Sequence, residues 1–195
     1  INDFAIEKNI KNIFFTSSIA PYGKSRNQVT ESDPIYPETP YGISKAIAEQ
    51  SHIAWLKESN SRRLIIVRPA VIYGPKDPGN IYRMIKAIKK GFFVIPGNGD
   101  IIKSYGYIYG LIDSILFVMK RDERMIIYNY TENPILKLNE LVNQIKQELN
   151  LRSLTFRMPV SLLVIIASFI YFFTKLLAKS SSIHPTRVRK ASFPT

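Results

Sequence analysis

Thr16-Ser17-Ser18-Ile19-Ala20-Pro21-Tyr22-Gly23 closes an apolar run, and after a polar loop the chain continues as Pro40-Tyr41-Gly42-Ile43-Ser44-Lys45. The apolar, β-prone residues that lead up to Thr16 are typical of a short, buried parallel strand. In open α/β sheets, ligands bind beyond the carboxyl ends of the strands. Ser17 and Ser18 are therefore expected at a ligand-binding edge.

Thr39 and Pro40 form a helix start, with a capping residue followed by proline at the first helical position. Tyr41 and Lys45 are one turn apart in this helix, so their side chains lie on the same face. A neighbouring ammonium favours the ionised form of a phenol. The pattern predicts Tyr41 as a general acid/base, with Ser18 as a hydroxyl donor to the same substrate oxygen.

The Tyr-x-x-x-Lys spacing recurs at Tyr82 and at Tyr171, so the spacing alone does not identify a site. Only Tyr41 follows both a strand-ending serine pair and a Thr-Pro helix start. At Tyr82 and Tyr171 we expect ordinary helix-surface or core packing.

Strands and helices alternate along the chain between residues 13 and 149. Strands are predicted over residues 13–16, 64–67 and 125–130, and helices over 40–58, 81–90 and 138–149. Consecutive β-α-β segments of this length favour parallel strands joined by a right-handed crossover. Residues 92–95 and 105–109 are further short strand candidates, the second of which leads into a helix that ends near Lys120.

Composition limits the classes of function. The chain has no cysteine, which excludes disulfides and cysteine metal sites, and its two histidines have no ligand spacing, so no metal site is expected. The net charge is +12, and every charged residue after Glu148 is basic. These basic residues flank an apolar block rather than alternate with aromatic residues, which favours an anionic lipid surface over nucleic acid as a partner.

Residues 158–174 contain no formal charge and consist mostly of leucine, isoleucine, valine and phenylalanine. A membrane-spanning helix needs about 20 apolar residues, so this block is at the short limit. Three interpretations remain open: a buried core helix, an interfacial helix that associates with a membrane surface through 158–190, and a membrane span.

Four motifs occur together and in order. They are Ser-Ser-x-x-x-Tyr-Gly (17–23), Pro-Tyr-Gly-x-Ser-Lys (40–45), Arg-Pro-Ala-Val-Ile-Tyr-Gly-Pro (68–75) and Gly-Asn-Gly (97–99). As a set, over roughly residues 1–150, they resemble the extended short-chain dehydrogenase/reductase family of nucleotide-sugar epimerases and dehydratases. The resemblance implies an α/β fold: the C-terminal part of a Rossmann-like doubly wound parallel sheet, a small α/β substrate-binding region and an apolar C-terminal helix. The corresponding domains are 1–75, 76–157 and 158–195.

The resemblance also assigns roles to residues. The catalytic residues would be Ser18, Tyr41 and Lys45. The cofactor, NAD or NADP, would contact Ser17, Tyr41, Lys45, Pro69 and Val71. The nucleotide-sugar substrate would contact Ser18, Ala20, Asn80, Val94 and Lys103. Family members are often dimers through two helices, which here would include the helix that carries Tyr41.

Departures from the family pattern reduce the number of reactions that the resemblance implies. Lys103 replaces a common arginine and Val71 a common asparagine, and Ile19-Ala20 stand where dehydratases carry acidic residues. These differences favour a 4-epimerase or 4-keto-sugar reductase over a dehydratase.

No Gly-x-x-Gly-x-x-Gly cofactor loop occurs in the sequence, and in the family this loop lies roughly a hundred residues before the serine. We therefore expect the chain to be the second half of an enzyme and to be inactive alone. The lack of cysteine is compatible with a cytoplasmic location, and the apolar, basic C-terminal segment makes the inner face of the cell membrane the alternative location. A noncatalytic remnant or a membrane-associated binding module is the alternative function.

Overall fold

The computed structural model describes residues 1–24, 28–152 and 155–176, without the side chains of 173, 175 and 176. The chain forms two compact units, which are treated separately below. The first contains Ile1–Gly74 and Ser104–Asn133, and the second contains Pro75–Lys103 and the described residues from Pro134 onward.

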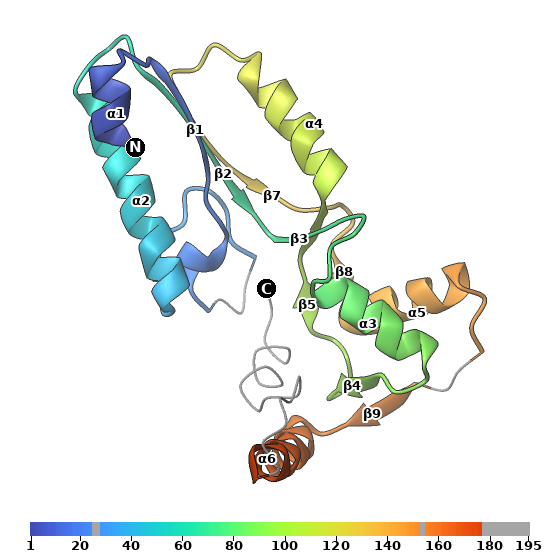
Figure 1. Cartoon of the computed structure of the whole chain (residues 1–195). Coiled ribbons are helices and arrows are strands. Elements are labelled where there is room, and N and C mark those ends of the chain that lie inside the picture. The colour runs from blue at the N-terminus through green and yellow to red at the C-terminus, as the bar shows by residue number, and fades with distance from the viewer. Residues whose placement is uncertain (25–27, 153–154, 177–195) are drawn as a thin grey trace. The chain divides into compact units, whose positions relative to one another are not determined.

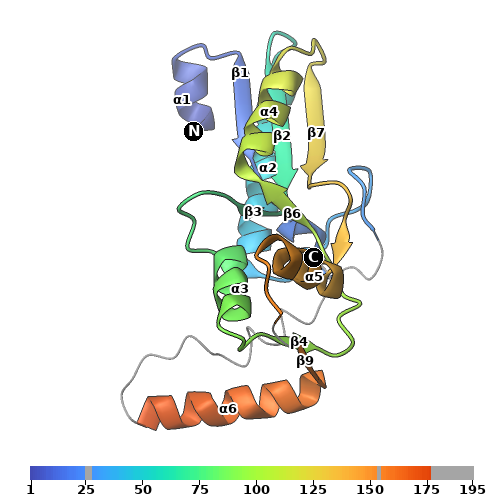
Figure 2. The same cartoon turned by 90° about the vertical axis from the view of Figure 1, so that its right-hand side faces the viewer.

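The first unit is built around a parallel three-stranded sheet with the order β1-β2-β7. Figure 1 shows α1 and α2 on one face of this sheet and α4 on the other, and Figure 2 agrees. Its elements are α1 (Asn2–Glu7), β1 (Asn12–Thr16), the 3-10 turn η1 (Ala20–Tyr22), α2 (Pro40–Lys57), β2 (Arg63–Pro69), β3 (Val71–Tyr73), β6 (Tyr105–Tyr107), α4 (Ile108–Met119) and β7 (Met125–Tyr130). The predicted α/β class with parallel strands is confirmed.

Local sequence explains the main elements of this unit. The Thr39 hydroxyl accepts a hydrogen bond from the Gly42 amide at 3.0 Å and caps α2, while Pro40 supplies the first helical residue. The apolar run Leu64–Val67 of the central strand β2 is buried, as expected for a strand covered on both faces. Trp55, Leu56 and Ala5 from the helices pack with Leu64 and Ile66 of that strand and form the core.

The second unit contains shorter elements. They are α3 (Asn80–Lys89), β4 (Val94–Pro96), β5 (Ile102–Lys103), β8 (Leu136–Lys137), α5 (Leu138–Glu148), β9 (Phe156–Met158) and α6 (Val160–Leu176). β4 pairs with β9 in parallel, and β5 pairs with β8 antiparallel. Within residues 1–24, 28–152 and 155–176, no helix is both long and apolar enough to cross a membrane.

Candidate active site

The carboxyl ends of β1 and β2 define the candidate site. Ser17 donates its amide hydrogen to the Val67 carbonyl at 2.8 Å, and Ile19 donates to the Pro69 carbonyl at 3.1 Å. The segment after β1 therefore continues along the end of β2 before it turns into η1. This places Ser17 and Ser18 at the edge of the sheet where an open α/β fold binds ligands.

Tyr41 and Lys45 lie on one face of α2, as predicted. The Lys45 ammonium is 5.9 Å from the centre of the Tyr41 ring and donates a hydrogen bond to the Thr16 carbonyl at 2.9 Å. It also lies 5.0 Å from the centre of the Phe15 ring. The last residues of β1 therefore hold the ammonium, while the Tyr41 side chain is 56% exposed and open to a ligand.

The second Tyr-x-x-x-Lys pair shows that the distance between tyrosine and lysine does not by itself identify a catalytic pair. On α3, the Lys86 ammonium is 6.0 Å from the Tyr82 ring centre, almost the same separation as in the first pair. One helical turn thus produces the tyrosine–lysine contact wherever it occurs. What marks the pair on α2 is the bond from Lys45 to the carboxyl end of a sheet strand.

Ser18 is half-buried, and its hydroxyl accepts a hydrogen bond from the Ala20 amide at 3.2 Å. The turn that follows packs closely on α2. A Cβ atom added to Gly42 would lie 2.7 Å from the Ala20 carbonyl oxygen, closer than real Cβ contacts. Glycine beside Tyr41 therefore lets η1 approach the start of α2, so Ser18 and Ala20 belong to segments adjacent to that helix end.

A buried polar network supports this edge, and the sequence analysis missed it. The Arg68 guanidinium donates to both carboxylate oxygens of Glu49, with the shortest contact at 2.6 Å, and to the Tyr22 hydroxyl at 2.7 Å. Ser17 donates its hydroxyl hydrogen to Glu49, and Tyr22 donates to the Asn129 side chain at 2.9 Å. The network joins α2, the end of β2, the residue before Ser18 and the end of β7.

The charges of this network are paired. Glu49 is fully buried and Arg68 is 5% exposed. Burial alone would lower the pKa of Arg68, but its bonds to Glu49 and Tyr22 outweigh that effect and raise the pKa. Two sequence signals could have identified this pair. Glu49 is a charged residue in the apolar face of a helix, and Arg68 is a charged residue at the end of an apolar strand.

Pro69 and Val71 follow the same strand edge. Pro69 is buried at the last position of β2, and Val71 is half-buried at the first position of β3, where it donates its amide to the Ser104 carbonyl at 3.4 Å. Both lie in the first unit with Ser17, Ser18, Tyr41 and Lys45.

The other three predicted site residues lie in the second unit, on three different elements. Asn80 is exposed at the first position of α3, and Val94 is half-buried at the first position of β4. Lys103, in β5, is only 7% exposed, and burial lowers the pKa of its ammonium to about 8.

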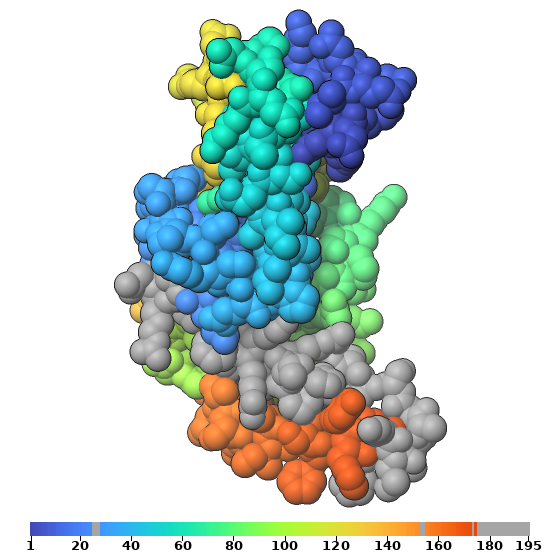
Figure 3. All heavy atoms as spheres, turned by 90° about the vertical axis from the view of Figure 1, so that its left-hand side faces the viewer, coloured from blue at the N-terminus to red at the C-terminus, as the bar shows by residue number. Residues whose placement is uncertain are grey.

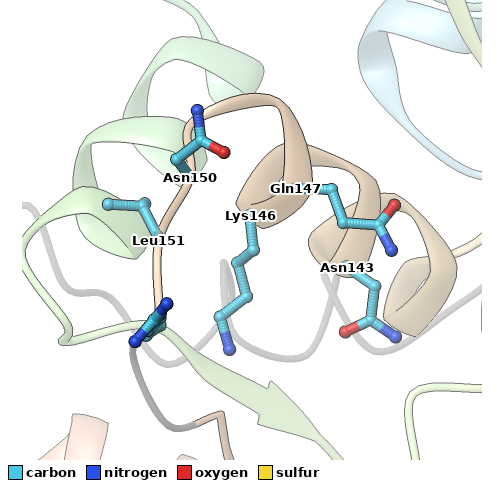
Figure 4. Close-up of a pocket in the computed structure, with 6 residues that line it drawn as sticks. Asn143, Lys146, Gln147, Asn150 and Leu151 are labelled. Atoms are coloured by element: carbon cyan, nitrogen blue, oxygen red, sulfur yellow. The ribbon is translucent and has the colours of Figure 1, made fainter.

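A shallow hollow of about 650 Å³ is also present in the second unit (Figure 4). Its lining comes from the last turns of α5 and the residues after them, namely Asn143, Lys146, Gln147, Asn150, Leu151 and Arg152. These are mostly amide and basic side chains, and none of them was predicted as a site residue.

A Rossmann-like α/β protein is the class defined by this fold and by the strand edge described above. The model of the NAD dependent epimerase/dehydratase family matches residues 1–130. The chain belongs to this family.

The named relatives are sugar epimerases. The chain is 34% identical over 189 residues to N-acetyl-alpha-D-glucosaminyl-diphospho-ditrans,octacis-undecaprenol 4-epimerase of Escherichia coli O157:H7, a match that covers 95% of this chain and 57% of the relative. It is 33% identical over 90 residues to UDP-glucose 4-epimerase of Vibrio cholerae, with 45% of this chain and 27% of the relative covered.

A solved structure shares the fold. UDP-glucuronic acid 4-epimerase from Bacillus cereus in complex with NAD superposes with a TM-score of 0.70 at 17% identity, over 81% of this chain and 53% of that one. The chain therefore spans about half the length of the proteins that it matches.

Proposed function

We propose that the protein that contains this chain is an NAD-dependent 4-epimerase of a sugar that carries a diphosphate at its anomeric carbon. The observation that supports it most is the position of Lys45, held by the Thr16 carbonyl at the end of β1 and 5.9 Å from the Tyr41 ring. The names of the three relatives reported above, each a 4-epimerase, favour this activity over that of a 4-keto-sugar reductase.

The residues at the strand edge fit the nicotinamide-ribose end of NAD. An ammonium has three donors, and the bond to Thr16 uses one of them, which leaves two for the hydroxyls of a ribose. The half-buried Val71, which follows the buried Pro69 at the end of β2, offers apolar surface to the nicotinamide. When bound, NAD supplies the acceptor and then the donor of the hydride at the sugar carbon.

Tyr41 acts as the acid/base of the proposed reaction. Its oxygen takes the proton of the sugar C4 hydroxyl as the hydride leaves the same carbon, and returns a proton after the hydride is delivered to the opposite face of the ketone. The ammonium of Lys45 stabilises the ionised tyrosine before the first proton transfer and after the second, and between them the tyrosine is neutral. Ser18 donates a hydrogen bond to the oxygen of the sugar that changes charge.

Nucleotide-linked and lipid-linked sugars both carry a diphosphate at the anomeric carbon, so both are candidate substrates. We infer that Lys103 and Asn80 contact it and that Val94 contacts the sugar. Lys103 offers a point charge, whereas an arginine would offer two parallel donors in a fixed plane. A lysine therefore accepts a wider range of diphosphate orientations.

The test compares Tyr41→Phe with Tyr82→Phe in the full-length protein, supplied with NAD. We expect Tyr41→Phe to lower turnover by about 10²–10⁴-fold, because general acid/base catalysis contributes this much, while cofactor binding persists. Tyr82→Phe is a matched control, since it removes the same hydroxyl from a second Tyr-x-x-x-Lys pair, and its turnover should be unchanged. Equal turnover in the two variants would contradict the proposal.

The same assay distinguishes the alternatives. UDP-N-acetylglucosamine and N-acetylglucosaminyl-diphospho-polyprenol are offered separately, and the product sugar is analysed for inversion at C4. An epimerase regenerates its cofactor, whereas a reductase consumes reduced cofactor in proportion to product. A wild-type protein that converts neither substrate and consumes no reduced cofactor would favour the noncatalytic alternative.

We also infer a homodimer through α2. Ile43 and Ile47, one turn apart, are 43% and 64% exposed. The helix itself lies on the surface that faces the viewer in Figure 3. Ile47→Asp should shift the full-length protein from dimer to monomer in sedimentation velocity, because it places an unpaired charge in an apolar contact. Ile135→Asp, at an exposed isoleucine outside α2, is the control and should leave the sedimentation coefficient unchanged. A monomeric wild-type protein would contradict the inference.

A further inference from the structure

Helix α6 has an exposed face that is apolar. Five large side chains on it are at least 39% exposed, and they are Leu162, Ile165, Ile166, Phe169 and Phe172. Their spacing, i, i+3, i+4, i+7 and i+10, places them on a single side of an α-helix. Among the described side chains of α6, the polar ones on the flank of this stripe are the exposed Ser161 and Ser168, and the Ser168 hydroxyl donates to the Val164 carbonyl at 2.8 Å.

Most of the other side of α6 is covered. Ala167 is 2% exposed, and Leu163, Val164 and Ile170 are half-buried, whereas Tyr171 on this side is 37% exposed. The helix therefore has two distinct sides, a largely covered one and an exposed apolar one. An exposed helix face of a globular protein normally carries charged and polar residues, so a contiguous apolar face of this kind marks a site of interaction.

The charge around α6 indicates what covers the exposed face. No acidic residue follows Glu148 in the sequence, whereas basic residues lie on both sides of the uncharged block 158–174. Arg152 and Arg157, which precede the helix, are exposed. A second copy of the same segment would bring like charges together, which disfavours self-association. An anionic surface is complementary to both the cations and the apolar face.

We propose that α6 docks on the surface of an anionic lipid bilayer, with its apolar stripe in the boundary between headgroups and acyl chains. Phe169 and Phe172, 60% and 63% exposed, are the main anchors, and Arg157 contacts the headgroups. The proposal does not depend on the epimerase function. It would, however, bring the protein to the surface where a lipid-linked diphosphosugar is found.

The experiment is flotation of the full-length protein with two kinds of vesicle, phosphatidylcholine alone and phosphatidylcholine mixed with phosphatidylglycerol, without NAD or sugar. We expect tight binding to the mixed vesicles and weaker binding to neutral ones. Phe169→Ser and Phe172→Ser should each lower the partition coefficient by about tenfold, because burial of one such side chain contributes at least that factor. Arg157→Gln should lower binding by about fivefold on the mixed vesicles only.

Phe117→Ser is the matched control, since Phe117 is 64% exposed on α4 in the first unit, and its vesicle binding should be unchanged. Circular dichroism checks that each variant is folded. The proposal is overturned if the wild-type protein does not float with the mixed vesicles, or if Phe169→Ser binds as the wild type does. It is also overturned if alkaline carbonate leaves the protein in cell membranes, which would indicate a span, or if the phenylalanine variants change the oligomer instead of vesicle binding. Because no catalytic step is measured, loss of epimerase activity and loss of membrane docking are separate results.

Discussion

Glu49 is a fully buried carboxylate on the side of α2 that faces the sheet, and its partner Arg68 is the penultimate residue of β2. Burial of two charges removes their hydration, and only close, multiple bonds offset that loss. Here the carboxylate receives hydrogen bonds from Arg68 and from Ser17, and the guanidinium also donates to Tyr22. The pair therefore fixes the residue before Ser18 relative to the helix that presents Tyr41.

Glu49→Gln tests this role at the scale of one residue. It leaves the Arg68 charge buried without its counterion, so we expect the free energy of unfolding to fall by about 3–5 kcal/mol. Urea denaturation followed by the fluorescence of Trp55, the single tryptophan, measures the change. Glu58→Gln is the matched control, because Glu58 bonds Arg62 at the exposed end of the same helix, and its effect should stay below about 1 kcal/mol. Equal losses in the two variants would contradict the assigned role.

At the scale of an element, α2 connects local sequence to the position of the site. Its start is set by Thr39 and Pro40, its first turn presents Tyr41, and its second turn presents Lys45. A fraying first turn would move Tyr41 away from Lys45 and from the end of β1, although the rest of the helix remained packed. The cap of this helix should therefore affect turnover as well as stability.

Thr39→Ala removes the hydroxyl that accepts from the Gly42 amide. We expect the unfolding free energy to fall by about 1 kcal/mol, since loss of an N-cap side chain has this effect, and turnover to fall with it. Thr39→Ser keeps the hydroxyl and should restore both quantities. Denaturation curves and the epimerase assay are measured for the wild type and both variants. Equal unfolding free energy and equal turnover in the alanine and serine variants would show that the cap has no role.

At the scale of the whole molecule, two buried basic groups contribute to the dependence of stability on pH, one in each unit. His52 packs against the Phe15 ring at 4.7 Å between centroids and lies 2.7 Å from the Asn2 side-chain oxygen, and burial lowers its pKa below 6.5. Lys103 has its pKa lowered from 10.5 to about 8 by burial. In both cases the unfolded chain binds the proton more tightly than the folded chain does.

The contribution of each of these two groups to stability should therefore rise with pH, in two separate windows, because stability increases wherever the unfolded state holds more protons. Tyr105 and Tyr130, whose pKa values burial raises, act against the Lys103 contribution above about pH 10. The part due to His52 is lost as pH falls below 6.5, and the part due to Lys103 grows between about 8 and 10.5, by up to about 3 kcal/mol. Denaturation curves from pH 5 to 11 test this. His52→Gln should flatten only the acid window and Lys103→Met only the alkaline one, and profiles that stay parallel to the wild type would exclude these groups as the cause.

Local patterns in the sequence determined the main elements of this protein. A capping residue and proline fix where α2 begins, the apolar run Leu64–Val67 fixes the central strand, and the one-turn spacing of Tyr41 and Lys45 fixes their common face. Each depends on neighbours within a few residues, so one sequence was sufficient. The motifs in order also identified the family, and three of the four, at residues 17–23, 40–45 and 68–75, lie wholly or mostly in the first unit around its sheet edge.

Only the tertiary structure decided which distant residues meet. The pairing of β3 with β6, β4 with β9 and β5 with β8 involves strands of two or three residues, too short to produce a periodic signal. The Glu49–Arg68 pair and the anchoring of Lys45 on Thr16 depend on a helix packed against a sheet, which brings together residues 19 and 29 positions apart. The exposed side of α6 likewise followed from burial, because an apolar sequence is compatible with a core helix, an interfacial helix or a span until its solvent-facing side is known.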